Sequence, residues 1–343
     1  MADYTKRSDG RLQKKIIDKK TGKPVYFYGK TKREINQKIL DYSHKEEKGL
    51  LFTELAQEWW EQAEQELSYQ TRENYKLGMK EASDFFKNAR IKEIKPKHVN
   101  EYINLLIRKG FAQKTISNKK VVCSRIFEYG VMKDYIEYNP CSSVKLPKNL
   151  PKKPRKPATV EEENKILEIT DVWIFPYIAL LTGLRKGEIL ALQWKDIDFT
   201  RKIINVEKSI YFEHNKPKIK LPKTEAGIRI VPLLEPLEER LLEIKSNNPE
   251  HFIICNDDGS PITNKKYRHL YNRFRKEFGI DASAHQIRHS FATAALESDV
   301  EVKSIQSLLG HRQISTTLDI YAAFRMKSFD KAAKKLNERF SKK

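Results

Sequence analysis

The types and spacing of five side chains in the second half of the chain suit attack on a phosphodiester. Arg185 lies in a Gly-Leu-Arg-Lys-Gly-Glu run, His285 and Arg288 in His-Gln-Ile-Arg-His, His311 after Leu-Gly, and Tyr321 ten residues further on. Guanidinium and imidazole groups can neutralise and hydrogen-bond the charge that develops around phosphorus, and a phenol can act as the nucleophile. The set therefore indicates metal-free phosphoryl transfer through a tyrosine.

Three side chains of the His-Gln-Ile-Arg-His run fall on one helical face. Positions three and four apart are neighbours on a helix, so His285, Arg288 and His289 are expected to face one pocket. The spacing of His285 and His289 also occurs in zinc-binding helices. However, Gln286 stands where a zinc protease has its glutamate base, and no convincing third ligand follows. We therefore expect no metal ion and interpret His289 as a supporting residue.

Two glycines are expected to place these candidates. Gly183 ends an apolar, helix-like run and can turn the chain so that the guanidinium of Arg185 enters a cleft. There it could contact a phosphate through two N–H groups, or it could simply pair with Glu188, which we interpret as its orienting partner. Gly310 closes a later helical stripe and is expected to direct His311 outward from a fixed point.

The charge of the chain favours a polyanionic partner. Its 343 residues include 66 Lys and Arg against 46 Asp and Glu, a net charge of +20, and the pI is near 9.6. The excess is clustered and interleaved with tyrosine and phenylalanine, which favours nucleic acid over a merely solvated basic surface. The most apolar stretch, residues 173–184, contains a proline and is too short to cross a bilayer, so no membrane partner is expected.

The amino terminus and the cysteines suggest a cellular compartment. The first residues are charged from position 3 and lack the apolar segment of a secretion signal, so we expect a cytoplasmic protein. Cys123, Cys141 and Cys255 form no Cys-x-x-Cys pair. Neither a disulfide framework nor a zinc ribbon is therefore expected.

Length and pattern predict more than one folding unit, mainly α with small β elements, which is an α+β class. Residues 1–48 contain two strand-like runs, 12–18 and 24–28, around a Lys-Thr-Gly-Lys turn, and then a Thr-Lys-Arg-Glu capping pattern that opens a helix. We interpret this segment as a small sheet packed on one helix that binds DNA; a disordered basic arm is the alternative. Its candidate DNA-binding residues are Lys14, Lys15, Lys30 and Lys32.

Residues 49–144 are expected to form a basic helical bundle. Pro96 and Gly110 bracket one helix, and another is expected from residue 112 to residue 133. The apolar stripe of this last helix faces the core, which leaves its cations for a partner or for ordinary solvation. These cations are Lys114, Lys119, Lys120 and Arg125.

Residues 145–157 hold six cations, four prolines and no acidic residue. This composition predicts an extended linker that cannot form a core. The linker could follow a phosphate backbone, or it could be a plain spacer. Its candidate DNA-binding residues are Lys152, Lys153 and Arg155.

Residues 158–343 are expected to form one further unit, which mixes helices with short strands. A Thr-Val-Glu-Glu capping pattern at residue 159 opens it. The tail from residue 325 has an amphipathic helical pattern that could dock on a neighbouring protomer or on its own unit. Strands are expected at 203–210, 217–221, 228–232 and 252–255.

Over residues 159–330 the motifs resemble those of the tyrosine recombinase family, particularly integrases of temperate phages and related mobile elements. The resemblance implies an active site with a first arginine, a hairpin lysine, a His-x-x-Arg pair, a Leu-Gly-His histidine and a tyrosine. In this chain these are Arg185, Lys223, His285, Arg288, His311 and Tyr321. It also implies an arm-binding domain at 1–48, a core-binding domain at 49–144 and a mixed α/β catalytic domain at 158–343.

The resemblance further implies that Tyr321 forms a 3'-phosphotyrosyl link and releases a 5'-hydroxyl, without any cofactor. Lys223 is expected to protonate the leaving oxygen, and His285 to accept the tyrosine proton. The implied partners are double-stranded DNA at core and arm attachment sites, other copies of the chain in a tetramer joined by tail exchange, a directionality factor and a host DNA-bending protein.

Two other functions would share many of these features. A type IB topoisomerase would use nearly the same chemistry, and a DNA-binding regulator would show the same charge without catalysis. The intact set of six residues argues against the regulator, because binding alone needs no nucleophile. The amino-terminal basic module and the short length favour integration over relaxation of supercoils.

Overall fold

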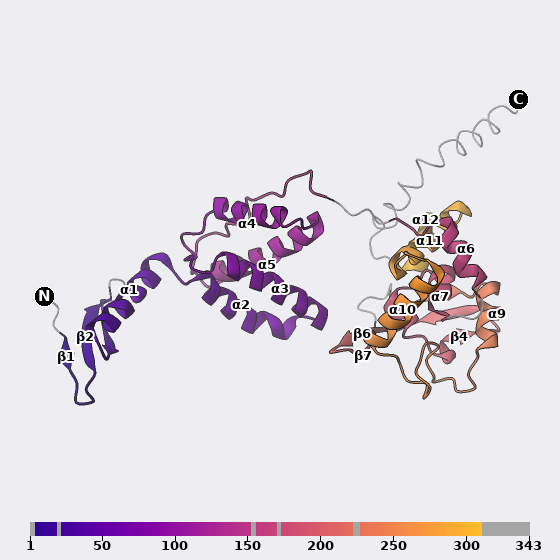
Figure 1. Ribbon diagram of the computed structural model, residues 1–343, viewed down its shortest axis with the longest axis horizontal. Helices are drawn as coiled ribbons and strands as arrows, with labels where there is room; N and C mark the ends of the chain where they lie inside the picture. Colours follow the sequence, from indigo (N-terminus) through magenta and orange to yellow (C-terminus); the bar gives the residue numbers. More distant parts are fainter. Residues whose placement is uncertain (1–3, 19–21, 152–155, 170–172, 222–226, 311–343) are drawn as a thin grey trace, which may run out of the picture. The chain divides into compact units, whose positions relative to one another are not determined.

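The computed structural model describes residues 4–18, 22–151, 156–169, 173–221 and 227–310 (Figure 1). The chain forms two compact units, residues 1–153 and 154–343, and each is described by itself. Both units are mainly helical, and the strands described lie in three small antiparallel sheets. This is the α+β class expected from the sequence. Within these described ranges, no helix combines the length and the apolar character needed to span a membrane.

The first part of the amino-terminal unit is the expected hairpin followed by a helix. β2 pairs with β3 in antiparallel register, and β1 pairs with the other edge of β2. The side chain of Thr31 accepts a hydrogen bond from the backbone N–H of Glu34 and so starts the helix. Phe27 on the sheet meets Tyr42 on the helix edge to face. The elements are β1 (Thr5–Lys6), β2 (Leu12–Ile17), β3 (Pro24–Gly29) and α1 (Lys32–Lys48).

The rest of this unit is a helical bundle around an aromatic core. The rings of Phe52, Phe86 and Phe127 pack together, and Tyr102 adds to them. Pro96 begins the third helix of the bundle, which ends two residues before Gly110, as the sequence predicts. The four helices are α2 (Phe52–Glu66), α3 (Tyr69–Phe85), α4 (Pro96–Arg108) and α5 (Gln113–Met132).

The carboxyl-terminal unit combines helices with two sheets, in the orders β4-β5-β8 and β6-β7. Its first elements are α6 (Val160–Glu168), α7 (Phe175–Thr182), α8 (Lys186–Ile189), the short 3-10 helix η1 (Trp194–Asp196) and β4 (Ile197–Asp198). The next are β5 (Ile203–Val206), β6 (Ser209–Glu213), β7 (Lys216–Lys220), β8 (Arg229–Pro232) and α9 (Glu235–Glu243). The last are α10 (Asn264–Phe278), α11 (Ala284–Glu297) and α12 (Val302–Leu309).

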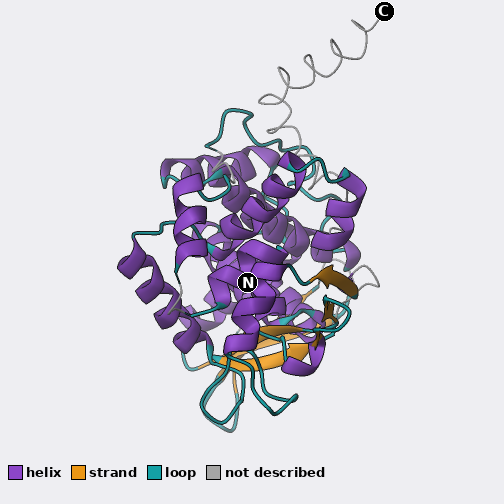
Figure 2. Ribbon diagram, turned by 90° about the vertical axis from the view of Figure 1, so that its right-hand side faces the viewer, coloured by secondary structure: helices purple, strands orange, loops and turns teal. Residues whose placement is uncertain are grey.

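Packing within this unit brings together segments that are far apart in sequence. α7 packs against α11, so the end of the Gly-Leu-Arg run and the His-Gln-Ile-Arg-His helix become neighbours. The carboxylate of Glu162 in α6 accepts hydrogen bonds from the backbone N–H groups of Asp281 and Ala282, at 2.7 and 2.9 Å, just before α11 begins. Figure 2 shows the strands of the unit gathered on one side, with most of its helices stacked on the other.

Two expectations about strands were wrong. Residues 252–255 form only isolated bridges, from Phe252 to Gln193 and from Cys255 to Pro261, because this segment closes a turn instead of running along a sheet. The strand expected at 203–210 is instead divided between β5 and the start of β6, which lie in different sheets. The strands expected at 217–221 and 228–232 are present as β7 and β8; β7 pairs with β6, whereas β8 pairs with β5. The chain between β7 and β8 therefore links two different sheets.

Candidate active site

Arg185 is delivered by the end of α7, as the Thr-Gly pair predicts. The hydroxyl of Thr182 donates to the carbonyl of Ile178 at 2.6 Å and accepts from the N–H of Leu184 at 3.2 Å. Gly183 then adopts a left-handed conformation with φ +63°. This turn places Arg185 at the start of α8, with its side chain 43% exposed. An exposed guanidinium on a fixed turn can meet a ligand without rearrangement of the backbone.

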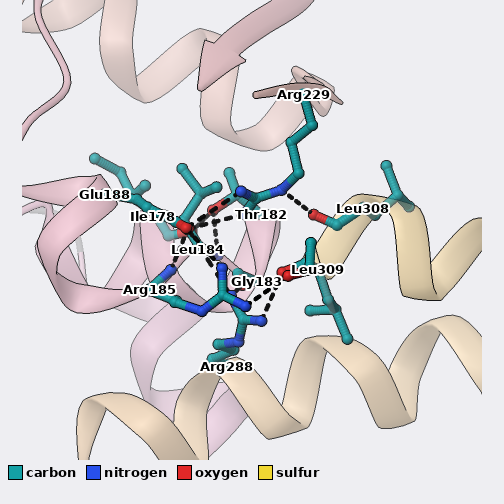
Figure 3. A network of polar contacts seen from close by, with 11 residues as sticks. Ile178, Thr182, Gly183, Leu184, Arg185, Glu188, Arg229, Arg288, Leu308 and Leu309 are labelled. Carbon is teal, nitrogen blue, oxygen red and sulfur yellow. Dashed lines mark hydrogen bonds and ion pairs between the residues drawn. The ribbon is translucent and has the colours of Figure 1, made fainter. Parts of the chain in front are cut away.

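Glu188 lies at the centre of a network of arginines (Figure 3). Its carboxylate accepts hydrogen bonds from the backbone N–H and the Nη1 of Arg185, both at 2.8 Å. Arg229 approaches from β8 with Nη1 at 3.2 Å and Nη2 at 2.8 Å, and Arg288 Nη1 lies 3.9 Å away. The expected pair of Arg185 with Glu188 is thus present, and it is part of a larger arrangement that holds Arg185 and Arg288 around one carboxylate.

The same arginines control the charge of Glu188. Burial of its side chain, which is only 8% exposed, raises the pKa of Glu188. Hydrogen bonds and positive charges from Arg229 and Arg185 outweigh that effect and bring the pKa to about 2. Glu188 is therefore ionised at neutral pH.

Arg288 is more deeply buried than Arg185, with 4% of its side chain exposed. It lies on α11, which Ser283 caps by accepting from the backbone N–H of Gln286. Burial, and then the charge of Arg185, lowers the pKa of Arg288 to about 9. The guanidinium still carries its charge at neutral pH, but it is poorly solvated and next to another cation. An anion placed between Arg185 and Arg288 would relieve both penalties.

The end of α12 belongs to the same network. The carbonyl oxygen of Leu308 accepts from Arg229 Nε at 2.6 Å, that of Leu309 from Arg288 Nη2 at 2.7 Å, and that of Gly310 from Arg185 Nη2 at 2.7 Å. The last carbonyls of a helix lack partners within the helix and carry a partial negative charge, so cations stabilise them. Gly310 has φ +62°, which confirms the expected left-handed cap.

His285 and His289 are neighbours on α11, as their spacing predicts. Their Nε2 atoms lie 3.1 Å apart and their rings meet edge to face, with centroids 4.6 Å apart. His289 is buried, whereas His285 is exposed and accessible to a ligand. The part of the chain that the structure describes contains no group of three or more His, Cys, Asp or Glu side chains arranged to hold a metal ion.

Several predicted site residues lie outside the described residues, so their place in the site stays a prediction. Among the catalytic candidates these are Lys223, His311 and Tyr321, and among the DNA-binding candidates Lys152, Lys153 and Arg155.

Sequence reasoning missed Arg229. Its strand has an exposed Ile230 between Arg229 and the fully buried Val231. Because alternate residues of a strand share a face, Arg229 points to the same side as buried Val231. A cation on the inner face of a strand was the available signal, since such a charge needs a buried partner.

The DNA-binding candidates of the amino-terminal sheet lie on both of its faces. Lys14 turns toward the helix side, where its Nζ lies 4.8 Å from the ring centre of Tyr4. Tyr4 in turn donates a hydrogen bond to Asn36 of α1. Lys15 is exposed and, as the next residue of the strand, points to the opposite face. Lys30 and Lys32 are exposed at the start of α1.

The expectation that Lys119 is available to a partner was wrong. Lys119 is only 6% exposed, pairs with Glu81 on α3, and lies with its Nζ 4.8 Å from the ring centre of Phe111. A buried ammonium needs such a partner to offset the loss of hydration. Lys114 and Arg125 are exposed, and Lys120 is partly exposed.

Comparison with known proteins identifies the relatives of this chain. The model of the phage integrase family matches residues 159–328, and that of the phage integrase N-terminal SAM-like domain matches residues 51–107. The chain is 30% identical over 263 residues to the ICEBs1 integrase of Bacillus subtilis, covering 71% of this chain and 70% of that protein. It is 28% identical over 360 residues to a XerC-like tyrosine recombinase of Caldanaerobacter subterraneus, and the match covers 92% of this chain and 91% of that protein.

Solved structures share the fold. The Tn1549 transposon integrase in complex with transposon right end DNA matches with a TM-score of 0.68 at 22% identity, over 82% of this chain and 100% of that one. A lambda integrase tetramer bound to a Holliday junction matches with a TM-score of 0.61 at 18% identity, over 90% of this chain and 95% of that one. Neither a topoisomerase nor a non-catalytic regulator is favoured by these matches. The chain therefore belongs to the phage integrase family of tyrosine recombinases, which cut and rejoin DNA strands.

Proposed function

We propose that this chain is a site-specific DNA recombinase that integrates and excises a mobile element through a phosphotyrosyl intermediate. The observation that carries the proposal is the convergence of Arg185 and Arg288 on Glu188, at 2.8 and 3.9 Å, although 103 residues separate the two arginines in sequence. Two fixed guanidiniums at one place suit the nonbridging oxygens of a single phosphate. The family and the relatives support the same reaction.

In the proposed reaction the phenol oxygen of Tyr321 attacks the scissile phosphorus while the bond to the 5'-oxygen breaks. The phenol proton passes to His285, and the leaving 5'-oxygen takes a proton from Lys223. Arg185 and Arg288 neutralise the charge that develops on the nonbridging oxygens, with a hydrogen bond from His311. The phosphotyrosyl ester retains the bond energy for religation, so the scheme includes no cofactor.

Double-stranded DNA is the proposed partner of both units. Lys15 lies on the outer face of the amino-terminal sheet, where Arg7 also donates to Gln13 at 3.2 Å and lies over the ring of Tyr28. This face is proposed to contact arm sites, and the bundle and the linker to contact core sites and their phosphates. The remaining proposed contacts are Lys14, Lys30, Lys32, Lys114, Lys120, Arg125, Lys152, Lys153 and Arg155.

We also propose that four copies assemble on two DNA sites and exchange their tails from residue 325 onward. Support comes from the lambda integrase structure, which is a tetramer on a Holliday junction. A directionality factor and a host DNA-bending protein are proposed as accessory partners, and the bacterial cytoplasm, where the DNA substrate resides, as the location.

The test first identifies the cut sites and then removes the nucleophile. Incubation with DNA that flanks the gene, followed by sequencing of protein-linked ends, should yield one pair of cut positions a few bases apart. On a nicked suicide substrate built from that site, Tyr321→Phe should bind DNA as wild type does but form no covalent adduct. Tyr138→Phe, which alters an exposed tyrosine of the other unit, serves as the control. Adduct formation by Tyr321→Phe would show that another residue is the nucleophile.

A further inference from the structure

Arg229 is a buried cation whose contacts connect three separate elements. Its side chain is 7% exposed, on β8. Nη1 and Nη2 donate hydrogen bonds to the two carboxylate oxygens of Glu188 on α8, and Nε donates to the carbonyl of Leu308 at the end of α12. Each of its three nitrogen atoms thus already has an acceptor within the protein. Arg229 is therefore suited to hold neighbouring groups and not to bind DNA itself.

The contact with Glu188 determines how firmly Arg185 is held. The carboxylate that Arg229 grips through both oxygens is the same one that fixes the backbone and the guanidinium of Arg185. A fork-to-fork pair of this kind defines the orientation of both partners, which a point charge cannot do. Without Arg229, the carboxylate would lose its fixed orientation and hold the backbone and guanidinium of Arg185 less firmly.

The contact with Leu308 extends this restraint to α12. Arg229 holds the Leu308 carbonyl, while Arg288 and Arg185 hold the two carbonyls that follow it. One side chain thereby links α8 to the end of α12, and the guanidiniums of Arg185 and Arg288 belong to the same network (Figure 3). Removing it would loosen both ends of the arrangement together.

We propose that Arg229 is a positioning residue for strand cleavage, acting through Glu188 and the end of α12 on Arg185 and Arg288. This inference rests on the proposed catalytic roles of those two arginines. It makes a specific claim: Arg229 affects the rate of chemistry more than the affinity for DNA, and most of its effect passes through Glu188.

The test compares single-turnover adduct formation on the suicide substrate for wild type, Arg229→Gln, Glu188→Gln and the double variant. Arg229→Gln should slow the reaction by about tenfold or more while the DNA dissociation constant changes by less than about threefold. In the Glu188→Gln background the same substitution should have a much smaller effect, because Arg229 then has no carboxylate to hold. Rate losses that simply multiply in the double variant would overturn the proposal.

The pH dependence provides a second readout that a merely structural role would not alter. A buried carboxylate that loses its guanidinium partner takes up a proton at higher pH. The rate of Arg229→Gln relative to wild type should therefore fall as the pH is lowered from about 7.5 to about 5.5. The nearby imidazoles of His285 and His289, on α11, are the same residues in both proteins. A ratio that stays constant with pH would count against the role of Glu188.

Two control variants and the wild type separate the possible failures. Arg240→Gln removes another partly buried arginine of the same unit, one that pairs with Glu243, and should leave the rate unchanged. Arg229→Lys keeps the positive charge but cannot form two parallel hydrogen bonds with the carboxylate, so it should react at an intermediate rate. A wild-type rate for this variant would overturn the proposal. If Arg229→Gln unfolds at the assay temperature, Arg229→Lys replaces it in the test. Absence of adduct with wild type would contradict the proposed function, whereas an active wild type and an equally active Arg229→Gln would contradict only the role of Arg229.

Discussion

A single carboxylate holds together groups that would otherwise repel one another. Arg185, Arg229 and Arg288 all lie within 4 Å of Glu188. Three guanidiniums against one carboxylate leave two excess positive charges in these four side chains, which is stable only because each cation also has a backbone carbonyl. At the residue scale, the site is thus an incompletely neutralised cluster, and such a charge suits the binding of a phosphate proposed above.

The low pKa of Glu188 predicts how stability depends on pH. Its pKa is about 2 in the folded chain against an ordinary 4.5, so as the pH falls the unfolded chain takes up this proton first. The stabilisation, on the order of 3 kcal/mol, is complete above about pH 4.5 and is lost as the pH falls toward 2. We expect Glu188→Gln to lower the free energy of unfolding at pH 7. The difference in the free energy of unfolding between wild type and this variant should become smaller between about pH 5 and pH 3.

Urea unfolding curves at each pH would measure this gap. Glu243→Gln alters an exposed glutamate that also pairs with an arginine, and it should show almost no gap at any pH. If the difference in the free energy of unfolding between wild type and Glu188→Gln does not depend on pH, the neighbours of the carboxylate do not hold it in its charged form.

At the scale of elements, the sequence predicted those whose ends are marked by a residue type. Thr31, Pro96 and Thr159 each stand at or next to the start of a helix, and Gly183 and Gly310 adopt left-handed conformations after helix ends. These signals act locally, through a cap or a positive φ, so they can be read without knowledge of the fold. The convergence of Arg185 with Arg288 was predictable only as part of a family constellation.

Features that depend on distant segments could not be predicted in this way. Lys119 shows helical periodicity like its neighbours, but Glu81, its partner, lies 38 residues earlier. Arg229 contacts groups 41 and 79 residues away. The separate sheets of β7 and β8 likewise depend on which strand lies beside each of them in the fold, and the alternation of side chains carries no information about that pairing.

The end of α7 offers a test at this scale. A Cβ atom at Gly183 would lie 2.4 Å from Phe291 Cδ1 and 2.9 Å from Leu309 Cδ2, whereas at Gly110, also with positive φ, nothing lies within 4 Å. Gly110→Ala should therefore lower the free energy of unfolding only by the cost of placing alanine in the left-handed conformation, about 1 kcal/mol. Gly183→Ala should lose about 2 to 4 kcal/mol and also slow adduct formation, because the clash displaces the turn that carries Arg185. Equal losses of stability, with a wild-type rate for Gly183→Ala, would contradict this account.

At the scale of the whole molecule, the chain combines a basic first unit with the unit that carries the arginine cluster. The two family models match residues 51–107 and 159–328, and residues 1–48 lie outside both. Those residues include 14 Lys and Arg against seven Asp and Glu. Under the proposed function, cleavage and much of the charge-driven attachment to DNA therefore fall to different parts of the chain.

Deletion of residues 1–48 should separate these two activities. The shortened chain should still form the adduct on a core site but should lose its affinity for arm sites. The plot of log Kobs against log salt concentration has a negative slope, and this slope should become less steep by about 0.9 for each phosphate contact that is lost. Binding titrations from low to moderate salt, with full-length protein as reference, would measure the slope. An unchanged slope would place the contacts elsewhere.

The carbonyls at the end of α12 imply a thermodynamic linkage between ligand binding and the segment that follows. Arg185 and Arg288 each donate one N–H group to that helix end, and under the proposed function a bound phosphate takes hydrogen bonds from the same side chains. Any event that changes the free energy of these carbonyl contacts, including restraint of the chain beyond Gly310 by another molecule, must change phosphate affinity. By reciprocity, phosphate then changes the affinity for that molecule by the same factor.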